Sequence, residues 1–393
     1  MNTSYKALFL FLLSFVTSYN LLFAQKDNSL KVPESSLSFQ EGLPQTPHAP
    51  YPYDTVEVEY DNVDKTVHLA GTLSYPKTGG PFTTVILITG SGQQDRDETI
   101  LGHKPFAVIA DFLTQKGYAV LRVDDRGKGK SKGDIYKATS MDFANDVITS
   151  VHFAEGLLQV DRKRIGLMGH SEGGLIAPIV YSKCPEIAFI VSLAGTGVSG
   201  ADILFKQQTD PVKGLVSAEA LVAYEKLTAG TLGLIKENVS MKDSALLALI
   251  RNQFAEWKKE YNDSVLTALN AKKATPEQYG FQVMTELKPW FRYFIATDPS
   301  EYWSQVNCPV LVLNGEKYIQ VYADQNTVAI TKALEKRGNN KYDLKIFPGL
   351  NHLFQHCDKC TVQEYGKLKE TFSIEVLNFI NEWMGKWIDS NKK

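Results

Sequence analysis

Short, mostly apolar runs alternate with segments of helical spacing along most of this chain. In the first part of the chain the apolar runs are residues 83–88, 119–123, 165–168 and 189–193. Runs of this kind are typical of parallel strands, because both faces of such strands are buried. The segments between the runs predict helices at residues 106–116, 141–158 and 175–181. Because strand and helix alternate, the sequence predicts an α/β protein with a mostly parallel central sheet.

The alternation stops near residue 197 and resumes near residue 308. Residues 197–305 are mainly helical in pattern and rich in aromatic side chains such as Trp257 and Trp290. We expect them to form an inserted helical cap over the carboxyl edge of the sheet, and an independent helical domain is the alternative. The core then consists of residues 55–196, which open with a predicted hairpin, and residues 306–393. This second part predicts strands at 310–313 and 342–347 and helices at 324–337 and 364–388.

The N-terminal residues predict export. Lys6 precedes an apolar stretch over residues 7–24 that several polar residues interrupt. A cleaved signal peptide over residues 1–24 fits this pattern best, and a membrane-spanning anchor is the alternative. We therefore expect a secreted or periplasmic protein without stable membrane insertion after the signal is removed. Residues 25–54 are rich in proline and predict an extended or mobile lead-in.

The composition limits the classes of partner. Of the 393 residues, 44% are hydrophobic and 22% are charged, and the formal net charge is -2. A protein so close to neutral has no field strong enough to attract a polyanion. We therefore expect a small-molecule partner and no nucleic acid.

The sequence GHSEGG at residues 169–174 directly follows the apolar run of residues 165–168. It matches the pattern G-x-S-x-G, in which a tight strand-to-helix turn leaves no room for a Cβ two positions from the serine. Such a turn lifts the hydroxyl clear of the sheet, and the N-terminus of the next helix stabilises a developing oxyanion. Ser171 is therefore the predicted nucleophile.

A serine hydroxyl is a poor nucleophile unless a neighbouring imidazole accepts its proton. Of the seven histidines, His352 is the best placed, because it ends the segment GLNH at residues 349–352, just beyond the last predicted strand. A loop at that point brings the ring to the carboxyl edge of the sheet. We interpret His170 as a residue that orients the turn rather than reacts.

Several segments together resemble the α/β-hydrolase superfamily, in particular bacterial esterases and the serine-aminopeptidase-like (S33-type) group. The segments are GSGQQDRD at residues 90–97, DDRG at 124–127, GHSEGG at 169–174, PWFR at 289–292 and GLNH at 349–352. The resemblance covers nearly the whole chain after the predicted signal. The chain order of serine, acid and histidine is also the order that these hydrolases use. The resemblance implies an α/β-hydrolase fold with an inserted helical cap.

The resemblance also implies an oxyanion hole. The sequence TGS at residues 89–91 stands where many hydrolases have His-Gly-x. The amide of Ser91, with that of Gly92 as the alternate, is therefore expected to act together with the amide of Glu172. We interpret the DRD sequence at residues 95–97 as a local ion-pair cluster that braces this loop, and a substrate-binding role for its arginine is the alternative.

The chain departs from the resemblance at the catalytic acid. Members of the group usually carry NGEKD at the position where this chain has NGEKY, residues 314–318, and their aspartate fixes the tautomer of the histidine. Tyr318 stands at the position of that aspartate and cannot hold a negative charge at neutral pH without a large shift in its pKa. Glu316 is our candidate for the acid and Asp324 is the next candidate. The acid can also simply be absent.

Cys357 and Cys360 are the only closely spaced pair among the four cysteines. A structural disulfide or two free thiols is the favoured interpretation. A zinc site needs two further ligands of similar spacing, and a redox motif needs a strand before the first cysteine. The sequence GTGVSG at residues 195–200 matches a dinucleotide-binding pattern, but the segment after it predicts helix rather than the required strand.

These features predict an exported serine hydrolase that cleaves carboxylic esters through an acyl-enzyme on Ser171. His352 acts as general base and acid, and no metal or organic cofactor is required. The aromatic residues of the predicted cap favour a small or medium acyl or aryl ester. One alternative is a serine peptidase or aminopeptidase on the same fold. The other is a catalytically impaired hydrolase fold that binds a ligand, because Tyr318 stands at the position of the acid.

Overall fold

The computed structural model describes residues 43–317 and 320–389. These residues form two compact units, a core of residues 43–198 and 298–389 and an insertion of residues 199–297. The predicted signal peptide and most of the lead-in lie outside the described residues. Within the described part of the chain, no helix is both long enough and apolar enough to cross a membrane.

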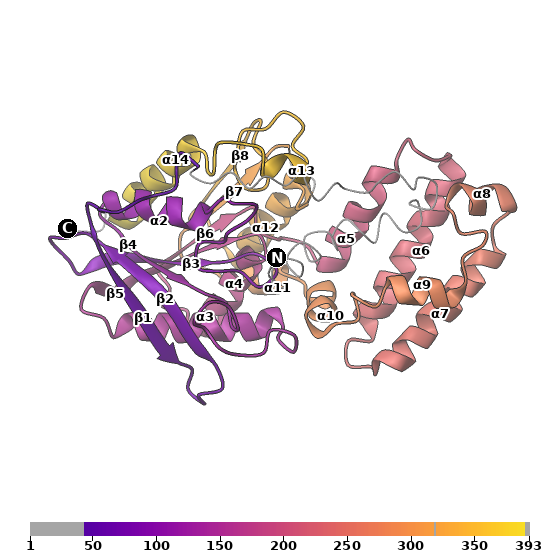
Figure 1. The fold of residues 1–393 in the computed structure, drawn as a ribbon, viewed down its shortest axis with the longest axis horizontal. Helices are drawn as coiled ribbons and strands as arrows, with labels where there is room; N and C mark the ends of the chain where they lie inside the picture. The colour runs from indigo at the N-terminus through magenta and orange to yellow at the C-terminus, as the bar shows by residue number, and fades with distance from the viewer. Residues whose placement is uncertain (1–42, 318–319, 390–393) are drawn as a thin grey trace. The chain divides into compact units, whose positions relative to one another are not determined.

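The core is built on one eight-stranded sheet with the order β1-β2-β4-β3-β5-β6-β7-β8 (Figure 1). The strands are β1 (Asp54–Asp61), β2 (His68–Tyr75), β3 (Phe82–Ile88), β4 (Ala119–Val123), β5 (Val160–His170), β6 (Phe189–Leu193), β7 (Val310–Gly315) and β8 (Tyr342–Phe347). β1 and β2 form the predicted hairpin, and β2 also runs antiparallel to β4. The remaining neighbours are parallel. The structure therefore confirms the α/β class and the mostly parallel sheet.

Helices cover both faces of this sheet. They are α2 (Pro105–Gln115), α3 (Ser140–Glu155), α4 (Gly173–Lys183), α11 (Ser300–Trp303), α12 (Ala323–Arg337), α13 (Val362–Tyr365) and α14 (Ile374–Met384). Helices α2 and α14 lie together on one face, and α3 and α4 lie together on the other (Figure 1). Phe106 of α2 and Ile380 of α14 belong to the same buried apolar cluster as Leu87 and Val191 of the sheet. Burial of these side chains contributes most to the stability of the core.

The single C-terminal helix predicted over residues 364–388 is wrong. The structure has the short helix α13, an irregular stretch, helix α14 and a π turn at Gly385–Asp389. In the irregular stretch Phe372 is buried, and its ring lies 5.4 Å from that of Phe354. The amides of Thr371 and Phe372 both donate to Oε1 of Gln45, at 2.6 and 3.1 Å. Amides bonded to a side chain cannot continue a helical ladder. The same contacts anchor this described part of the lead-in to the core.

The insertion is entirely helical in its regular structure. Its elements are α5 (Gly200–Thr209), a 3-10 turn at Asp210–Val212, α6 (Ala218–Glu237), α7 (Asp243–Lys259), α8 (Asp263–Ala268), α9 (Pro276–Gln282) and α10 (Pro289–Ala296). The unit is slightly shorter than the predicted residues 197–305. Helix α11 belongs to the core, where the indole of Trp303 donates to the carbonyl of Thr196 at 3.3 Å.

Aromatic side chains of the insertion pack against one another. The ring of Phe254 stacks on those of Trp257 and Tyr279, with centroids 5.6 and 4.6 Å apart. The rings of Trp290 and Phe294 stack at 5.3 Å. These contacts stabilise the insertion itself. They therefore give no support to the expectation of a small or medium acyl or aryl ester, which stays a prediction.

Arg292, from the PWFR motif, holds the insertion together. Its side chain is buried, and Nε donates to the carbonyl of Leu287 at 3.0 Å. Nη1 donates to the carbonyls of Val239 and Met241, and Nη2 forms an ion pair with Asp243 at 2.6 Å. A buried guanidinium needs such a set of acceptors. The motif residue is therefore structural.

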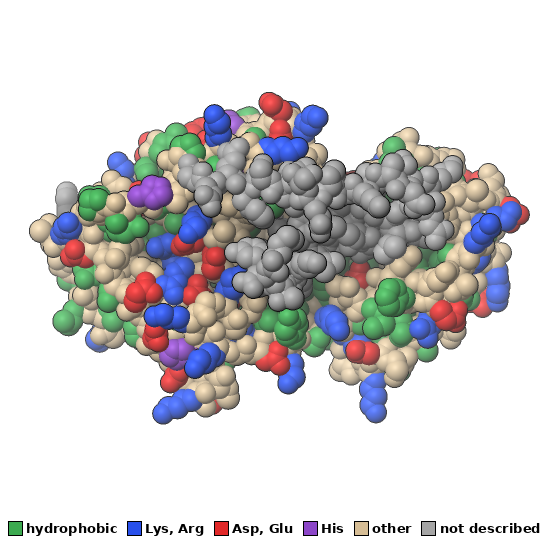
Figure 2. Space-filling model, in the orientation of Figure 1, with side chains coloured by type: hydrophobic (Ala, Val, Ile, Leu, Met, Phe, Trp, Pro, Cys, Tyr) green, Lys and Arg blue, Asp and Glu red, His purple; other side chains and the backbone are tan. Residues whose placement is uncertain are grey.

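Charged side chains of both signs are interspersed on the face shown in Figure 2. This pattern agrees with the net charge of -2. On this face the described residues present no large patch of a single sign.

Candidate active site

The predicted nucleophile lies on a strained turn between β5 and α4. Ser171 has a φ of 55°, in the left-handed region that residues other than glycine rarely adopt. Its amide donates to the carbonyl of Leu193 at the end of β6, at 2.9 Å. A Cβ on Gly169 would lie 2.1 Å from the carbonyl oxygen of Gly173, and a Cβ on Gly173 would lie 2.2 Å from that of Ile88. Only glycine allows these backbone approaches, so the local structure is the one that the motif predicts.

His352 lies in the loop after β8, and the buried Asn351 shapes this loop. Oδ1 of Asn351 accepts hydrogen bonds from two amides of the loop, at 2.9 and 3.0 Å. The carbonyl of His352 accepts a hydrogen bond from Nε2 of His170 at 3.0 Å. The two imidazole rings lie 4.4 Å apart between centroids. Because His170 precedes Ser171 in the chain, the loop brings His352 to the turn that carries the predicted nucleophile.

The loop after β3 also approaches this turn. A Cβ on Gly90 would lie 3.1 Å from Cβ of Ser171, so the backbone of the loop is in contact with the nucleophile turn. Ser91 follows directly and is half-buried. Glu172 is buried at the N-terminus of α4, where its carboxylate accepts a hydrogen bond from Oγ of Ser140 at 2.6 Å. Glu172 directly follows Ser171 in the turn, and Ser91 directly follows Gly90, whose backbone contacts Ser171. The role of the two amides as oxyanion donors stays a prediction.

A buried acid that the sequence does not predict joins these segments. Glu98 is 1% exposed and has a φ of 51°. Its Oε1 accepts a hydrogen bond from the amide of Gly90 at 2.7 Å and lies 2.9 Å from Nδ1 of His170. Nε2 of the same ring faces the carbonyl of His352, so both ring nitrogens face acceptors. In the sequence Glu98 stands among other acidic residues, and its place near the GSG motif is the signal that could have indicated its position at the site.

The two histidines differ in electrostatic environment. Burial lowers the pKa of His170, but the charge of Glu98 and its hydrogen bond outweigh burial and leave the pKa above its ordinary value. Burial lowers the pKa of His352 well below its ordinary value, and the charge of His170 lowers it further. His352 is therefore neutral at neutral pH, which is the state in which an imidazole accepts a proton.

Asp125, just after β4, is a second acid whose environment the sequence does not reveal. Its carboxyl group accepts hydrogen bonds from Oγ1 of Thr89 and from the amide of Gln94, each at 2.7 Å. Burial nevertheless raises its pKa well above the ordinary value, and the charges of Glu172 and Glu98 raise it further. A carboxyl group in this environment favours its neutral form.

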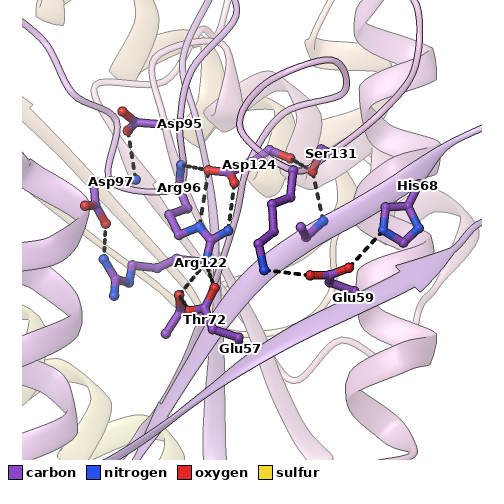
Figure 3. A network of polar contacts seen from close by, with 12 residues as sticks. Glu57, Glu59, His68, Thr72, Asp95, Arg96, Asp97, Arg122, Asp124 and Ser131 are labelled. Atoms are coloured by element: carbon purple, nitrogen blue, oxygen red, sulfur yellow. Dashed lines mark hydrogen bonds and ion pairs between the residues drawn. The ribbon is translucent and has the colours of Figure 1, made fainter.

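The ion pairs of the DRD sequence reach distant segments, which corrects the expectation of a local cluster (Figure 3). The guanidinium of Arg96 contacts Asp124 through Nη2, at 2.7 Å, and through Nε, at 3.2 Å. Its Nη1 lies 2.7 Å from Glu57 of β1. Asp97 forms an ion pair with Arg122 of β4. The loop is braced, as predicted, and these contacts occupy Arg96, so they give no support to a substrate-binding role.

The catalytic acid stays a prediction. Glu316 is exposed just after β7, and its carboxylate accepts a hydrogen bond from the amide of Gly349 at 3.3 Å. The carboxylate therefore contacts the start of the loop that carries His352. Tyr318 lies outside the described residues. Asp324, the further candidate, is exposed on α12.

Cys357 and Cys360 form a disulfide. Of the two favoured alternatives, the structure has the disulfide rather than free thiols. Together with Glu364 the two sulfurs are close enough to hold a metal ion, but the sulfurs of a disulfide are not thiolate ligands. Glu364 instead accepts hydrogen bonds from the amides of Lys359 and Cys360, at 3.0 and 2.6 Å. This pair is therefore a structural element of the loop that follows His352.

The sheet order and the turn after β5 define the class: the protein is an α/β-hydrolase. The sequence model of the X-Pro dipeptidyl-peptidase (S15) family matches residues 51–354. The chain belongs to this family and is a hydrolase. This match confirms the predicted α/β-hydrolase group of esterases and peptidases. Within that group the matching family is S15, whereas the sequence motifs resemble the S33-type group.

Individual relatives agree with this class. The esterase EstD of Thermotoga maritima is 27% identical over 338 residues, which are 85% of this chain and 70% of that protein. A 2-hydroxy-6-oxononadienedioate/2-hydroxy-6-oxononatrienedioate hydrolase of Escherichia coli is 24% identical over 196 residues, which are 50% of this chain and 63% of that enzyme. The α/β hydrolase GrgF from Penicillium sp. sh18 has a similar fold, with a TM-score of 0.50 and 15% identity, over 86% of this chain and 99% of that chain.

Proposed function

We propose that the protein hydrolyses carboxylic esters through an acyl-enzyme on Ser171, with His352 as general base and acid. The observation that carries the proposal is the φ of 55° at Ser171. The preceding residue, His170, forms a hydrogen bond with the backbone carbonyl of His352 and so links the two proposed catalytic residues. Strain of this kind persists where the surrounding structure fixes it and is common at active sites. The resemblance to an esterase over 85% of the chain supports the choice of esters.

In the proposed reaction the Ser171 hydroxyl attacks the ester carbonyl carbon while His352 accepts its proton. The amides of Ser91 and Glu172 bind the oxyanion of the tetrahedral intermediate. His352 then returns the proton to the leaving alcohol, and the acyl-enzyme forms. Water, deprotonated by His352, attacks the acyl-enzyme and releases the acid and free Ser171. Each proton moves between His352 and an oxygen, so this chemistry needs no metal or organic cofactor.

A serine peptidase is the second candidate, because the chain belongs to the X-Pro dipeptidyl-peptidase family. The two candidates are separated by assays with p-nitrophenyl acyl esters and with X-Pro and aminoacyl p-nitroanilides. Turnover of the esters that is lost in Ser171→Ala is the expected result. Ser182→Ala is the matched control, since Ser182 lies on α4 and donates only to the carbonyl of Ile179. Turnover of the anilides alone would replace the esterase proposal by the peptidase one.

The acid requires a separate test. If Glu316 supports His352, Glu316→Gln lowers kcat by up to about four orders of magnitude. If the acid is absent, Glu316→Gln has little effect, and Tyr318→Asp raises kcat by restoring a carboxylate. A wild-type protein that is as inert as Ser171→Ala on every ester and anilide would favour the alternative of a binding protein on a hydrolase fold.

We further propose that the protein is exported, with residues 1–24 as the signal peptide. The apolar stretch after Lys6 supports this proposal, and so does the disulfide of Cys357 and Cys360, because disulfides persist in oxidising compartments. Cell fractionation and N-terminal sequencing test it. The expected result is a periplasmic or secreted protein that begins at Gln25. A cytosolic protein with Met1 intact would contradict it.

A further inference from the structure

We propose that His170 is a positioning residue: as an imidazolium paired with Glu98, it fastens the His352 loop to the oxyanion loop and places a positive charge beside the general base. This inference rests on the proposed function of Ser171 and His352. It assigns roles to two residues that the reaction itself does not require.

The hydrogen-bond geometry requires two protons on the His170 ring. Nδ1 lies 2.9 Å from Oε1 of Glu98, and Nε2 lies 3.0 Å from the carbonyl oxygen of His352. A neutral imidazole has one N–H and one lone pair, so it would direct its lone pair at one of these acceptors. The ring is 4% exposed, where an unsatisfied contact of this kind is costly. The imidazolium satisfies both acceptors.

Glu98 is the counter-ion that this charge needs. The small cavity beside the ring is lined by Glu98 and by apolar side chains of α2, β6 and the segments after β8, namely Phe106, Leu193, Leu353 and Phe372. Among the described residues, His352 is a further titratable group beside His170, and the two rings lie 4.4 Å apart. A charge among apolar groups is stable only when it is paired. Glu98 is held in a left-handed conformation, with a φ of 51°, which is a further sign of a fixed functional geometry.

The pair connects the loop after β3 and the loop after β8 at the nucleophile turn. Oε1 of Glu98 accepts a hydrogen bond from the amide of Gly90 at 2.7 Å, next to the predicted oxyanion donor Ser91. Through His170 the same oxygen is linked to the backbone of His352. The positive charge disfavours protonation of His352, so the general base stays neutral to a lower pH than a free imidazole.

The pH dependence of kcat/KM tests this role in a way that a purely structural role would not affect. Glu98→Gln keeps an oxygen for the amide of Gly90 but removes the counter-ion, so His170 loses its charge. The acid limb of the profile, which reports His352, is then expected to move up by about one pH unit. The control is Asp146→Asn, which removes a half-buried carboxylate of α3 that pairs with Arg126 at 2.7 Å. An acid limb that stays in place in folded Glu98→Gln would overturn the proposal.

NMR of the wild-type protein tests the charge directly and does not depend on a variant that folds. Imidazole nitrogens are labelled with 15N, and His170→Gln identifies its signals among the seven histidines. Both nitrogens of His170 are expected to carry protons at pH 7. An unprotonated Nδ1 or Nε2 at pH 7, including the case in which the proton resides on Glu98, would overturn the proposal. This readout also applies to Ser171→Ala, so it separates the inference from the proposed function. If Ser171→Ala keeps full ester turnover, the function fails whatever the state of His170.

Discussion

Arg96 and Asp124 form a two-pronged ion pair that ties the loop after β3 to the loop after β4, with contacts of 2.7 and 3.2 Å (Figure 3). The side chain of Asp124 is 5% exposed and that of Arg96 is 15% exposed. The contact therefore lies in a poorly solvated environment. Loss of one partner leaves the other charge buried without compensation.

We predict that Arg96→Ala lowers the free energy of unfolding by about 3 kcal/mol or more, because Asp124 is left unpaired. Urea unfolding followed by circular dichroism measures this change. Glu57→Gln is the matched control, because its carboxylate pairs with the same guanidinium but is 56% exposed. Its loss is expected to cost at most about 1 kcal/mol. Equal losses of unfolding free energy in the two variants would show that the buried contact with Asp124 contributes no more to stability than the exposed contact with Glu57.

The strained conformation of Ser171 predicts a trade of stability against activity. Glycine adopts a φ of 55° without a Cβ clash, so Ser171→Gly is expected to raise the free energy of unfolding by about 0.5–1 kcal/mol. The same change removes the proposed nucleophile and abolishes ester turnover. Ser171→Ala removes the hydroxyl but keeps the Cβ, so it is expected to be inactive without the gain in stability.

Thermal unfolding of the three proteins under one condition checks this prediction. Ser182→Gly on α4 is the control, because glycine inside a helix is destabilising. If Ser171→Gly is less stable than Ser171→Ala, relief of backbone strain at the turn does not decide the stability of these variants.

The sequence predicts the strands well because most of them are short, mainly apolar runs, whereas β1 and β2 carry the alternating pattern of a hairpin. It places Ser171 and His352 in loops that follow predicted strands, and their catalytic roles stay predictions. It does not predict Glu98 or Asp125, because their properties arise from burial between loops that are distant in the chain. The local signals are the place of Glu98 near the GSG motif and the place of Asp125 in the DDRG segment, and neither signal reveals burial.

The error in the predicted C-terminal helix has a similar origin. Residues 364–388 have helical spacing, but the side chain of Gln45, more than three hundred residues away, binds the amides of Thr371 and Phe372. Tertiary contacts therefore decide between two structures that the local pattern allows equally.

The disulfide of Cys357 and Cys360 is expected to contribute to stability and not to turnover. It closes a loop of few residues, so the double variant Cys357→Ser/Cys360→Ser should lose about 2 kcal/mol of unfolding free energy at most. His352 is held by the hydrogen bonds of Asn351, at 2.9 and 3.0 Å, which the variant leaves intact. Ester turnover well below the melting temperature should therefore stay within about threefold of wild type, whereas Asn351→Ala should lose most of it. If Cys357→Ser/Cys360→Ser lost ester turnover while Asn351→Ala stayed active, the disulfide and not Asn351 would be the element that holds His352.

The environment of Asp125 predicts a pH-dependent gain in stability on substitution. Its pKa in the folded protein is raised by burial and by Glu172 and Glu98, so the folded state keeps a proton that the unfolded state releases. Stability is therefore lost as the pH rises from the ordinary range of an aspartate, near about 4, through the raised pKa. Asp125→Asn mimics the neutral form and removes this loss. The melting temperature of the variant should exceed that of wild type by about 2–4 °C at pH 8 and by less at pH 5.

Asp64 is the control with the reverse sign. The hydroxyl of Thr66 donates to its carboxylate at 2.6 Å and lowers its pKa. The stability from this contact is present above the ordinary pKa and is lost as the pH falls through the lowered value. Asp64→Asn should therefore be slightly less stable than wild type at neutral pH. Differential scanning calorimetry of each variant and of wild type, at pH 8 and at pH 5, measures these differences. A gain for Asp125→Asn that does not depend on pH would assign it to packing rather than to the buried charge.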